Sequence, residues 1–457
     1  MLLIILIGLY SGGDYVSRSS SSVRDWANDR VGSWGGFGDN QEVYTPKEAV
    51  PKPQPKPKPI AKPYKASGQA ISESHNEISS TSTKSGRYFN INFGDYQAMN
   101  PNIIPHPSLN ETWIIVAQRY KNDTSNPTWF TELVCEARFN AGDLECIKSP
   151  LILPIPGTLS EKCEGDLSFF NFNIGPHDAR VFFGPDRPYI IYGSQSSYNC
   201  FGQWMQDLRL LVDWAHVRTL DDPFRIPTDL QRPPPYGPIE KNWFPFWDAD
   251  GEIYMHYDIA PERVFGKLGF DGSVGEDLAP LARNNDEKCL GEYMAPPDPD
   301  LPESIHQATN SLTVTMCKRG DTDCKLTDSN TFIFTIVQRK SYYDFHSEYE
   351  PYVVLFKRRS PFELHSISSK PVWIKGRKER LDLPTPSEES EDGQEERRPH
   401  TEMLYVTSMS WKAQGQRYHG YLDDELFIGF GIEDKDTGGI DVLASDLLED
   451  LGLCSEL

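Results

Sequence analysis

The stretch from Glu240 to Phe265, EKNWFPFWDADGEIYMHYDIAPERVF, decides the fold class. Its first residues are polar and run directly into aromatic residues, and Asp250-Gly251 then marks a turn. After the turn, the run from Ile253 to Tyr257 alternates as in a half-buried strand. Asp-Gly before such a run is a good hairpin signal. The stretch therefore predicts a strand, a tight turn and a return strand.

The same turn-and-strand unit recurs along the chain. Apolar runs that follow turn residues begin at positions 112, 188, 252, 331 and 425. Their uneven spacing excludes a short-period array and fits small sheets joined by loops of variable length. The sequence therefore predicts an all-β fold, a five-bladed β-propeller. Any all-β protein contains turn–strand pairs, so an ordinary sheet protein is the alternative.

Composition restricts the partners of this chain. The protein has 457 residues and a formal net charge of -22. Such an acidic chain is a poor match for nucleic acid, whose phosphates need basic partners. No Cys/His spacing typical of zinc occurs, so we predict no metal. We expect a monomer, with residues 376–400 forming a solvated acidic insertion loop.

The N-terminal part differs from the rest in composition. Leu2–Leu9 is an apolar run that is far shorter than the roughly 20 residues a bilayer requires. We interpret residues 1–10 as a partial signal anchor or signal peptide, with a frayed apolar end as the alternative. Residues 11–87 are rich in Ser, Pro and Lys and predict a disordered stalk. Residues 88–457 then form the propeller domain.

Cysteines and sequons indicate the compartment. Two cysteine pairs flank predicted turns and are expected to form disulfides: Cys135–Cys146 and Cys317–Cys324. The other four are paired by elimination, as Cys163–Cys200 and Cys289–Cys454. N-glycosylation sequons begin at Asn110 and Asn122. Together these features predict the secretory pathway: a single-pass type II Golgi membrane protein with a lumenal head or, alternatively, a secreted protein.

Polar residues gather just before the apolar run of each unit, which we expect to be the innermost strand, so they would rim the central funnel of a propeller. The candidate site residues are Asn100, Arg119, Asp178, Arg180, Glu240, Lys241, Asn242, Asn310, His419 and Asp423. Structural alternatives stand beside these roles: Asp178 could cap a turn, and Lys241 could pair with Glu240. His419 and Asp423 could only order a loop. His256 lies within a strand, where we expect it to pack in the core.

The order of motifs resembles the five-bladed propellers of the β-mannoside phosphorylases and the related β-1,2-mannosyltransferases. The matching segments, spread over about residues 96–450, are Asp178-Ala179-Arg180 with Tyr189 and Tyr192 beyond, Glu240-Lys241-Asn242, Pro361 with Pro371, and the strand Asp424–Ile428. The chain departs from the pattern twice. Ala179 replaces a proline, and Gln338-Arg339 stands where phosphorylases carry a histidine.

The resemblance implies roles for these residues. Asp178 would protonate the glycosidic oxygen, and Arg180 and Lys241 would hold phosphate or a nucleotide-sugar pyrophosphate. The missing histidine argues against chemistry with free phosphate. The stalk, the apolar N-terminal run and the acidic head favour a mannosyltransferase that moves mannose, expected to be β-linked, from a nucleotide sugar, GDP-mannose, to a glycan acceptor.

Other functions remain open at this point. A secreted glycoside hydrolase or phosphorylase acting on mannosides is the alternative enzyme. An inverting hydrolase would need a second carboxylate about 6.5–9.5 Å from the first, which Glu240, Glu350 or Asp423 could supply. A sugar-binding propeller without catalytic activity is the third candidate.

Overall fold

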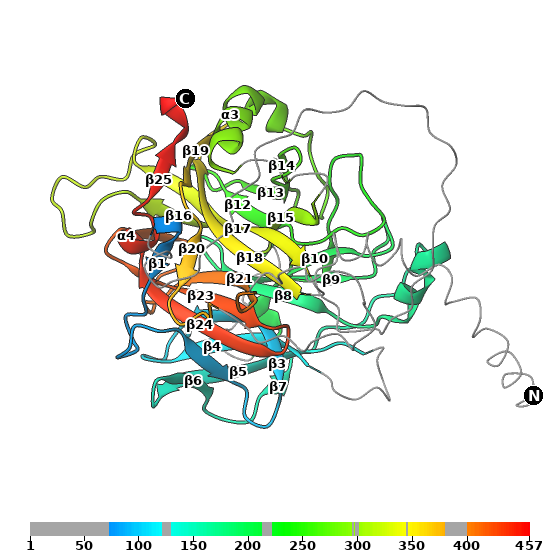
Figure 1. The fold of residues 1–457 in the computed structure, drawn as a ribbon. Helices are drawn as coiled ribbons and strands as arrows, with labels where there is room; N and C mark the ends of the chain where they lie inside the picture. The colour runs from blue at the N-terminus through cyan, green and yellow to red at the C-terminus, as the bar shows by residue number, and fades with distance from the viewer. Residues whose placement is uncertain are drawn as a thin grey trace, which may run out of the picture.

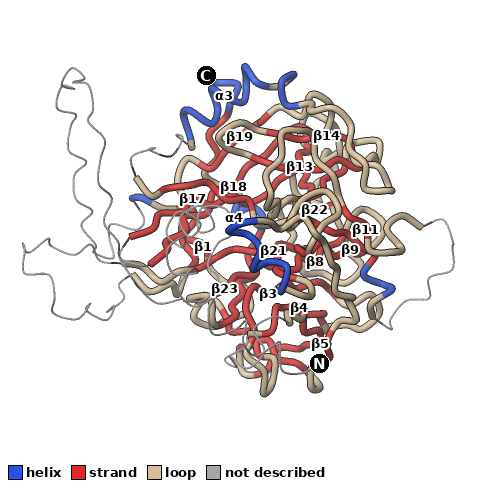
Figure 2. Tube along the Cα trace, turned by 90° about the vertical axis from the view of Figure 1, so that its right-hand side faces the viewer, coloured by secondary structure: helices blue, strands red, loops and turns tan. Residues whose placement is uncertain are grey.

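The computed structural model describes residues 73–120, 129–212, 222–294, 297, 301–343, 346–379 and 400–457. Strands form nearly all of the regular structure in these ranges, so the predicted all-β fold class is confirmed (Figures 1 and 2). The helical segments are α3 (Arg283–Tyr293), α4 (Ala444–Leu447), η1 (Gly165–Phe172), η2 (Leu208–Leu210), η3 (Ala279–Leu281) and η4 (Cys454–Glu456). The predictions for residues 1–72, for Asn122 and for residues 380–399 lie outside the described residues.

Consecutive antiparallel strands form five groups along the chain. The first three groups are β3 (Ala98–Pro105), β4 (Trp113–Arg119), β5 (Glu132–Asn140) and β6 (Asp143–Cys146); β8 (His177–Phe183), β9 (Pro188–Ser194), β10 (Gly202–Asp207) and β11 (Thr228–Asp229); and β12 (Phe244–Trp247), β13 (Ile253–Asp258) and β14 (Val264–Lys267). The last two are β16 (Leu312–Thr315), β17 (Thr331–Tyr343), β18 (His346–Lys357) and β19 (Leu364–Ser368); and β21 (Leu404–Trp411), β23 (Glu425–Ile432) and β24 (Asp436–Leu443).

Seven further strands pair with one another or with these groups. They are β1 (Asn76–Ile78) with β20 (Val372–Ile374), β2 (Phe89–Asn92) beside β24, β7 (Leu151–Ile152) on β5, β15 (Glu303–Gln307) on β17, β22 (His419–Tyr421) on β16, and β25 (Leu451–Leu453) on β19. Because β2 also pairs in parallel with β6, it joins the first and last groups into one nine-stranded sheet. The five-blade count stays a prediction, since hydrogen bonding yields sheets of nine, seven, four, three and two strands.

Side-chain bonds between the first strands of neighbouring groups hold the fold together. Asn102 of β3 donates to the Ala179 carbonyl of β8 at 2.8 Å and accepts from the Val181 amide at 3.0 Å. Asn310, just before β16, makes the same two-way bond with the backbone of Met409 on β21. Each of these side-chain amides pairs with buried backbone N–H and C=O groups that have no hydrogen-bonded partner strand at that position. We call them amide clasps.

The clasped first strands correct one sequence interpretation. The five apolar runs, at 112, 188, 252, 331 and 425, were expected to be the innermost strands, but they form β4, β9, β13, β17 and β23, the second strand of each group. The first strands escaped notice because polar residues and proline interrupt their apolar pattern. Examples are Asn100-Pro101 in β3 and Pro245 in β12.

Ordered structure begins earlier than the predicted stalk boundary at residue 87. β1 pairs in parallel with β20, and its Ile78 is buried in the core. The hydroxyls of Ser80 and Ser82 donate to the carboxylate of Asp441, which is fully buried and also pairs with Lys412 at 2.6 Å. A serine-rich stretch is typical of a linker, yet here its hydroxyls donate hydrogen bonds to the buried carboxylate of Asp441.

All four predicted disulfides are present. Cys135–Cys146 closes the β5–β6 hairpin, whose turn residues Ala141 and Gly142 both have the positive φ typical of tight hairpins. The bonds Cys163–Cys200, Cys317–Cys324 and Cys289–Cys454 are also formed, and the last ties α3 to the C-terminus. The four disulfides are consistent with a secreted or lumenal protein.

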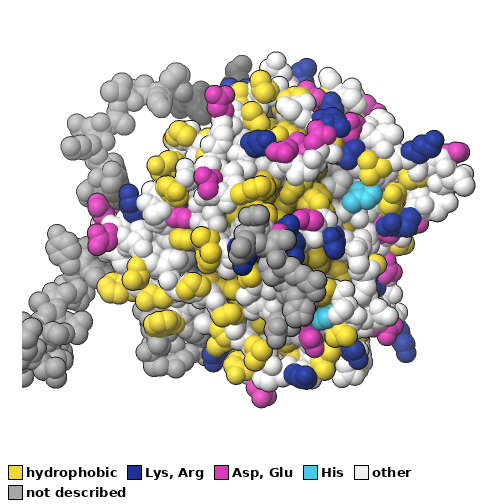
Figure 3. Space-filling model, turned by 180° about the vertical axis from the view of Figure 1, so that it is seen from behind, with side chains coloured by type: hydrophobic (Ala, Val, Ile, Leu, Met, Phe, Trp, Pro, Cys, Tyr) yellow, Lys and Arg dark blue, Asp and Glu magenta, His cyan; other side chains and the backbone are white. Residues whose placement is uncertain are grey.

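Charges of both signs are mixed on the face of the molecule that is turned away from the viewer in Figure 1. Figure 3 shows acidic and basic side chains interspersed with apolar ones on the back of the molecule. The sequon residue Asn110 is exposed at the end of the loop after β3. Among the described helices, none has the length and apolar character needed to cross a membrane.

Candidate functional site

Backbone irregularities mark one end of the first strands. The β3–β4 register shifts between Met99 and Asn102, and the β8–β9 register shifts between His177 and Arg180. Within these bulges Asn100 and Asp178 have φ of 57° and 50°, in the left-handed region that non-glycine residues rarely occupy. Bulges re-aim side chains, and such strain concentrates at functional sites.

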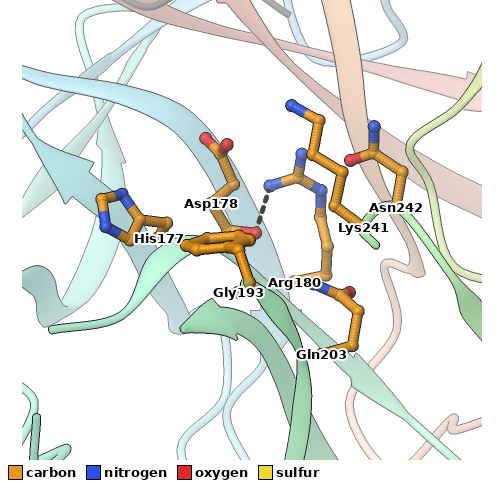
Figure 4. Close-up of a pocket in the computed structure, with 8 residues that line it drawn as sticks. His177, Asp178, Arg180, Gly193, Gln203, Lys241 and Asn242 are labelled. Atoms are coloured by element: carbon orange, nitrogen blue, oxygen red, sulfur yellow. Dashed lines mark hydrogen bonds between the residues drawn. The ribbon is translucent and has the colours of Figure 1, made fainter. Parts of the chain in front are cut away.

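A pocket opens beside these bulges. It is lined by His177, Asp178, Arg180, Gly193, Phe201, Gln203, Lys241 and Asn242 (Figure 4). Four residues singled out from the sequence therefore come together, from β8 and from the segment just before β12. In Figure 4 the carboxylate of Asp178, the guanidinium of Arg180 and the amine of Lys241 point to the same side of the pocket.

Asp178 is held in place from two sides. Its Oδ1 accepts a 2.8 Å hydrogen bond from Asn100 Nδ2, and its backbone amide donates to Gln118 Oε1 at 2.8 Å. Burial acts to raise the pKa of Asp178, but the charges of Arg180 and Lys241 outweigh it and leave the pKa below its ordinary value. The carboxyl group is therefore ionised in the empty pocket.

The two pocket cations differ in how they are held. Arg180 is buried, and its Nε donates to the Ala308 carbonyl at 2.7 Å while Nη1 donates to the Asp178 carbonyl at 2.8 Å. These bonds fix the guanidinium. Burial, together with the charges of Arg180 and Lys340 and against the opposing charge of Asp178, lowers the pKa of Lys241 to about 8. Lys241 is thus a cation that loses its proton just above neutral pH.

Glu132, on β5, is a site-adjacent acid that the sequence analysis missed. Its side chain is fully buried, and Oε1 accepts from the backbone amide of Ala179 at 3.2 Å. Burial raises the pKa of Glu132 to about 8, and the charge of Asp178 contributes to the rise. Glu132 therefore carries its proton at neutral pH directly behind the Asp178–Arg180 segment.

Residues from later groups also reach this site. Lys340 of β17 lowers the pKa of Lys241 and, together with burial, the pKa of His306. Burial raises the pKa of Asp434 to about 7, and the charge of Asp178 contributes. Tyr405 of β21 interacts with Arg180. Sequence signals for these residues were weak, although Lys340 lies two positions after Gln338 and so on the same strand face.

Three predicted site residues have structural partners instead. Glu240 is buried and bonds Arg232 at 2.9 Å and the Gly237 amide at 2.6 Å, so it neither pairs with Lys241 nor lines the pocket. The side-chain amide of Asn310 forms the amide clasp to the backbone of Met409. Arg119, at the end of β4, stacks over Tyr96 at 5.1 Å.

His419 and Asp423 lie at the other end of the strands. His419 Nε2 bonds Thr315 Oγ1, at the end of β16, at 2.8 Å, and Asp423 accepts from the Arg319 amide at 2.7 Å. Antiparallel geometry explains this. Residues before a first strand lie at one end of a sheet, whereas residues in the turn before a second strand lie at the opposite end. His256 packs in the core as expected, stacked on Phe244 at 4.7 Å.

Comparisons with known proteins add the following. No family model and no curated protein matches the chain. Solved structures similar to it include a β-1,2-mannobiose phosphorylase from Listeria innocua in complex with β-1,2-mannobiose (11% identity, TM-score 0.39, covering 79% of this chain and 92% of that one). A glycosyl hydrolase from Bacteroides ovatus is 10% identical, with a TM-score of 0.36 over 80% of this chain and 90% of that one. The catalytic domain of a GH62 α-L-arabinofuranosidase from Coprinopsis cinerea is 9% identical, with a TM-score of 0.35 over 78% of this chain and 96% of that one.

These structures include the phosphorylase class that the sequence motifs resemble. Their low identities and TM-scores assign no activity to this chain.

Proposed function

We propose that the protein is a carbohydrate-active enzyme that cleaves mannosides by phosphorolysis. The observation that carries this proposal is a single pocket carboxylate, Asp178, flanked by the cations Arg180 and Lys241. Such a pair of cations suits an anionic reactant, because Arg presents a fork to phosphate oxygens and Lys a point charge. The choice of mannose rests on the motifs that resemble β-mannoside phosphorylases.

Simple hydrolysis fits the pocket less well. An inverting hydrolase needs a second carboxylate to activate water. Among the residues that line the pocket, Asp178 is the one acid. Glu240 is bound to Arg232, and Glu132 is fully buried. Water therefore lacks a second carboxylate there, whereas phosphate would bring its own nucleophilic oxygen.

The proposed reaction assigns a step to each group. A phosphate oxygen held by Arg180 and Lys241 attacks the anomeric carbon while the glycosidic C–O bond breaks. Asp178 gives its proton to the departing oxygen, directly or through a sugar hydroxyl, and a sugar 1-phosphate results. Arg180 and Lys241 hold Asp178 ionised, but phosphate would offset their positive charges and raise the pKa of Asp178 so that it could carry the proton.

The missing phosphorylase histidine was the sequence argument against free phosphate. In the structure Gln338 is an amide clasp to the backbone of Val406, while Lys340 adds positive charge to the site. Lys340 could take over part of the anion-binding role.

Transfer from GDP-mannose is the second candidate, because a pyrophosphate suits the same cations. The four disulfides favour it, since they agree with a lumenal location such as the Golgi.

Product analysis separates these reactions. The full-length protein is incubated with β-1,2-mannobiose, with and without inorganic phosphate, and separately with GDP-mannose and mannobiose. We expect mannose 1-phosphate only when phosphate is present. Asp178→Asn should lower its formation about 10²–10⁴-fold, whereas Asp423→Asn, a matched change at the opposite end of the strands, should retain it. Phosphate-independent release of mannose would contradict the proposal, and release of GDP with chain extension would favour the transferase.

A further inference from the structure

A histidine–carboxylate cluster lies outside the pocket. His346 and Glu348 are on β18, and His400 lies four residues before β21. One possible ligand atom from each of the three residues lies within 4.8 Å of the others. His346 and His400 are buried, and Glu348 is half-buried. This cluster could not be predicted from local sequence patterns, because 51 residues separate Glu348 from His400.

Hydrogen bonds orient two of these side chains. His346 Nε2 lies 2.9 Å from the Thr401 carbonyl, which can only accept, so Nε2 donates this hydrogen bond and Nδ1 is the ring nitrogen that remains for a metal ion. Metal-binding histidines almost always have a second partner of this kind on the other ring nitrogen. Glu348 Oε1 accepts from the amide and hydroxyl of Thr401, which orients its carboxylate.

A further carboxylate lies beside the free histidine nitrogen. Glu433 Oε2 is 3.8 Å from His346 Nδ1, and Glu433 Oε1 accepts from the Met403 amide at 2.8 Å. The three clustered donors thus come from the start of β18 and the residues before β21, and Glu433, in the turn between β23 and β24, adds a carboxylate next to His346.

We propose that His346, Glu348 and His400 bind one divalent transition-metal ion, preferably Zn²⁺, with Glu433 as the fourth ligand. Two imidazoles with carboxylates are a ligand set typical of zinc, whereas Ca²⁺ and Mg²⁺ prefer all-oxygen sites. None of the four residues lines the pocket. The ion therefore has a structural role that is independent of the proposed reaction: it cross-links three segments.

Direct metal binding tests this proposal. The full-length protein, without an affinity tag, is stripped with EDTA and titrated with Zn²⁺ in competition with a chromophoric chelator. We expect one equivalent to bind, and Co²⁺ to give the visible absorption of a four-coordinate site. His346→Asn and His400→Asn should each weaken Zn²⁺ binding by about 100-fold or more, and Glu433→Gln by about 10-fold.

The control and the opposing outcomes are equally direct. His365→Asn changes a half-buried histidine that stacks on Phe332 away from the cluster, and it should bind Zn²⁺ like the parent. The proposal is wrong if the cluster variants bind as tightly as the parent, or if the parent shows no saturable binding. Should a cluster variant fail to fold, the parent alone decides: its Tm must rise with Zn²⁺ and not with Mg²⁺, because a ligand that binds only the native state stabilises it.

Discussion

Raising the pH through the pKa of Lys241 should weaken phosphate binding if the proposed function is correct. Burial, reinforced by Arg180 and Lys340, lowers the pKa of Lys241 to about 8. A lysine with an ordinary pKa would stay charged throughout the neutral and mildly alkaline range. Lys241 instead loses its charge between pH 7 and 9, and the pocket then keeps Arg180 as its lining cation.

The size of the effect follows from this pKa. With a pKa of about 8, the charged fraction of Lys241 falls from about 90% at pH 7 to about 10% at pH 9. If phosphate binds only to the charged form, its KM should rise about tenfold over this range, or roughly 1.4 kcal/mol in binding free energy. The KM for the mannoside should change much less, because a neutral sugar does not depend on that charge.

The assay is the initial rate of phosphorolysis at several phosphate concentrations between pH 6.5 and 9.5. Lys241→Arg is the matched variant, since an arginine stays protonated over the whole range. Changes in the ionisation of phosphate itself affect both proteins equally. The parent should therefore lose phosphate affinity with rising pH relative to the variant. Parallel profiles for the two proteins would refute the assignment of Lys241 to the anion.

Two further predictions concern stability. Removal of residues 1–72 should retain the fold, because they lack a core-forming pattern. Removal of residues 1–87 should lower the free energy of unfolding, measured in urea, by at least about 3 kcal/mol, because the core loses Ile78 and Asp441 loses its hydroxyl donors. Equal stabilities of the two truncated proteins would contradict the revised boundary. Glu132→Gln should raise Tm at pH 8–9 with little effect at pH 5. The raised pKa of Glu132 means that the native state binds the extra proton between its ordinary pKa and about 8, so the parent loses stability as the pH rises through that window; a Tm gain that is equal at both pH values would exclude this cause.

Local signals explain what could be predicted of the fold. The second strand of each group and the hairpin disulfides could be predicted from turn residues and from apolar–polar alternation. Both patterns extend over only a few positions, and the turns and hairpins that they specify are equally local in the folded chain. The clasped first strands do not show this alternation, because their polar residues serve neighbouring groups. β1 has only three residues, and its pairing with β20 depends on a contact across nearly 300 positions, about which a short serine-rich segment carries no information.

The site shows a similar limit. Asp178, Arg180, Lys241 and Asn242 were identified from the order of motifs, and they do share a pocket. The rule that polar residues precede strands could not separate the two ends of an antiparallel group, so it also selected Asp423. Glu132 was missed because its importance comes from burial behind another strand, and burial of a lone acid within an apolar run has no reliable sequence pattern.

The position of β2 has a consequence for how the chain is made. β2 is made long before its antiparallel partner β24, since Phe89 pairs with Gly439. The nine-stranded sheet cannot be completed until β24 has been made, and one edge of β2 stays unpaired until then. Such late, long-range pairing slows folding and exposes strand edges to other chains. The N-terminal strand must therefore be shielded while the rest of the protein is being made, so newly made chains of this protein should depend on chaperones more than their stability would suggest.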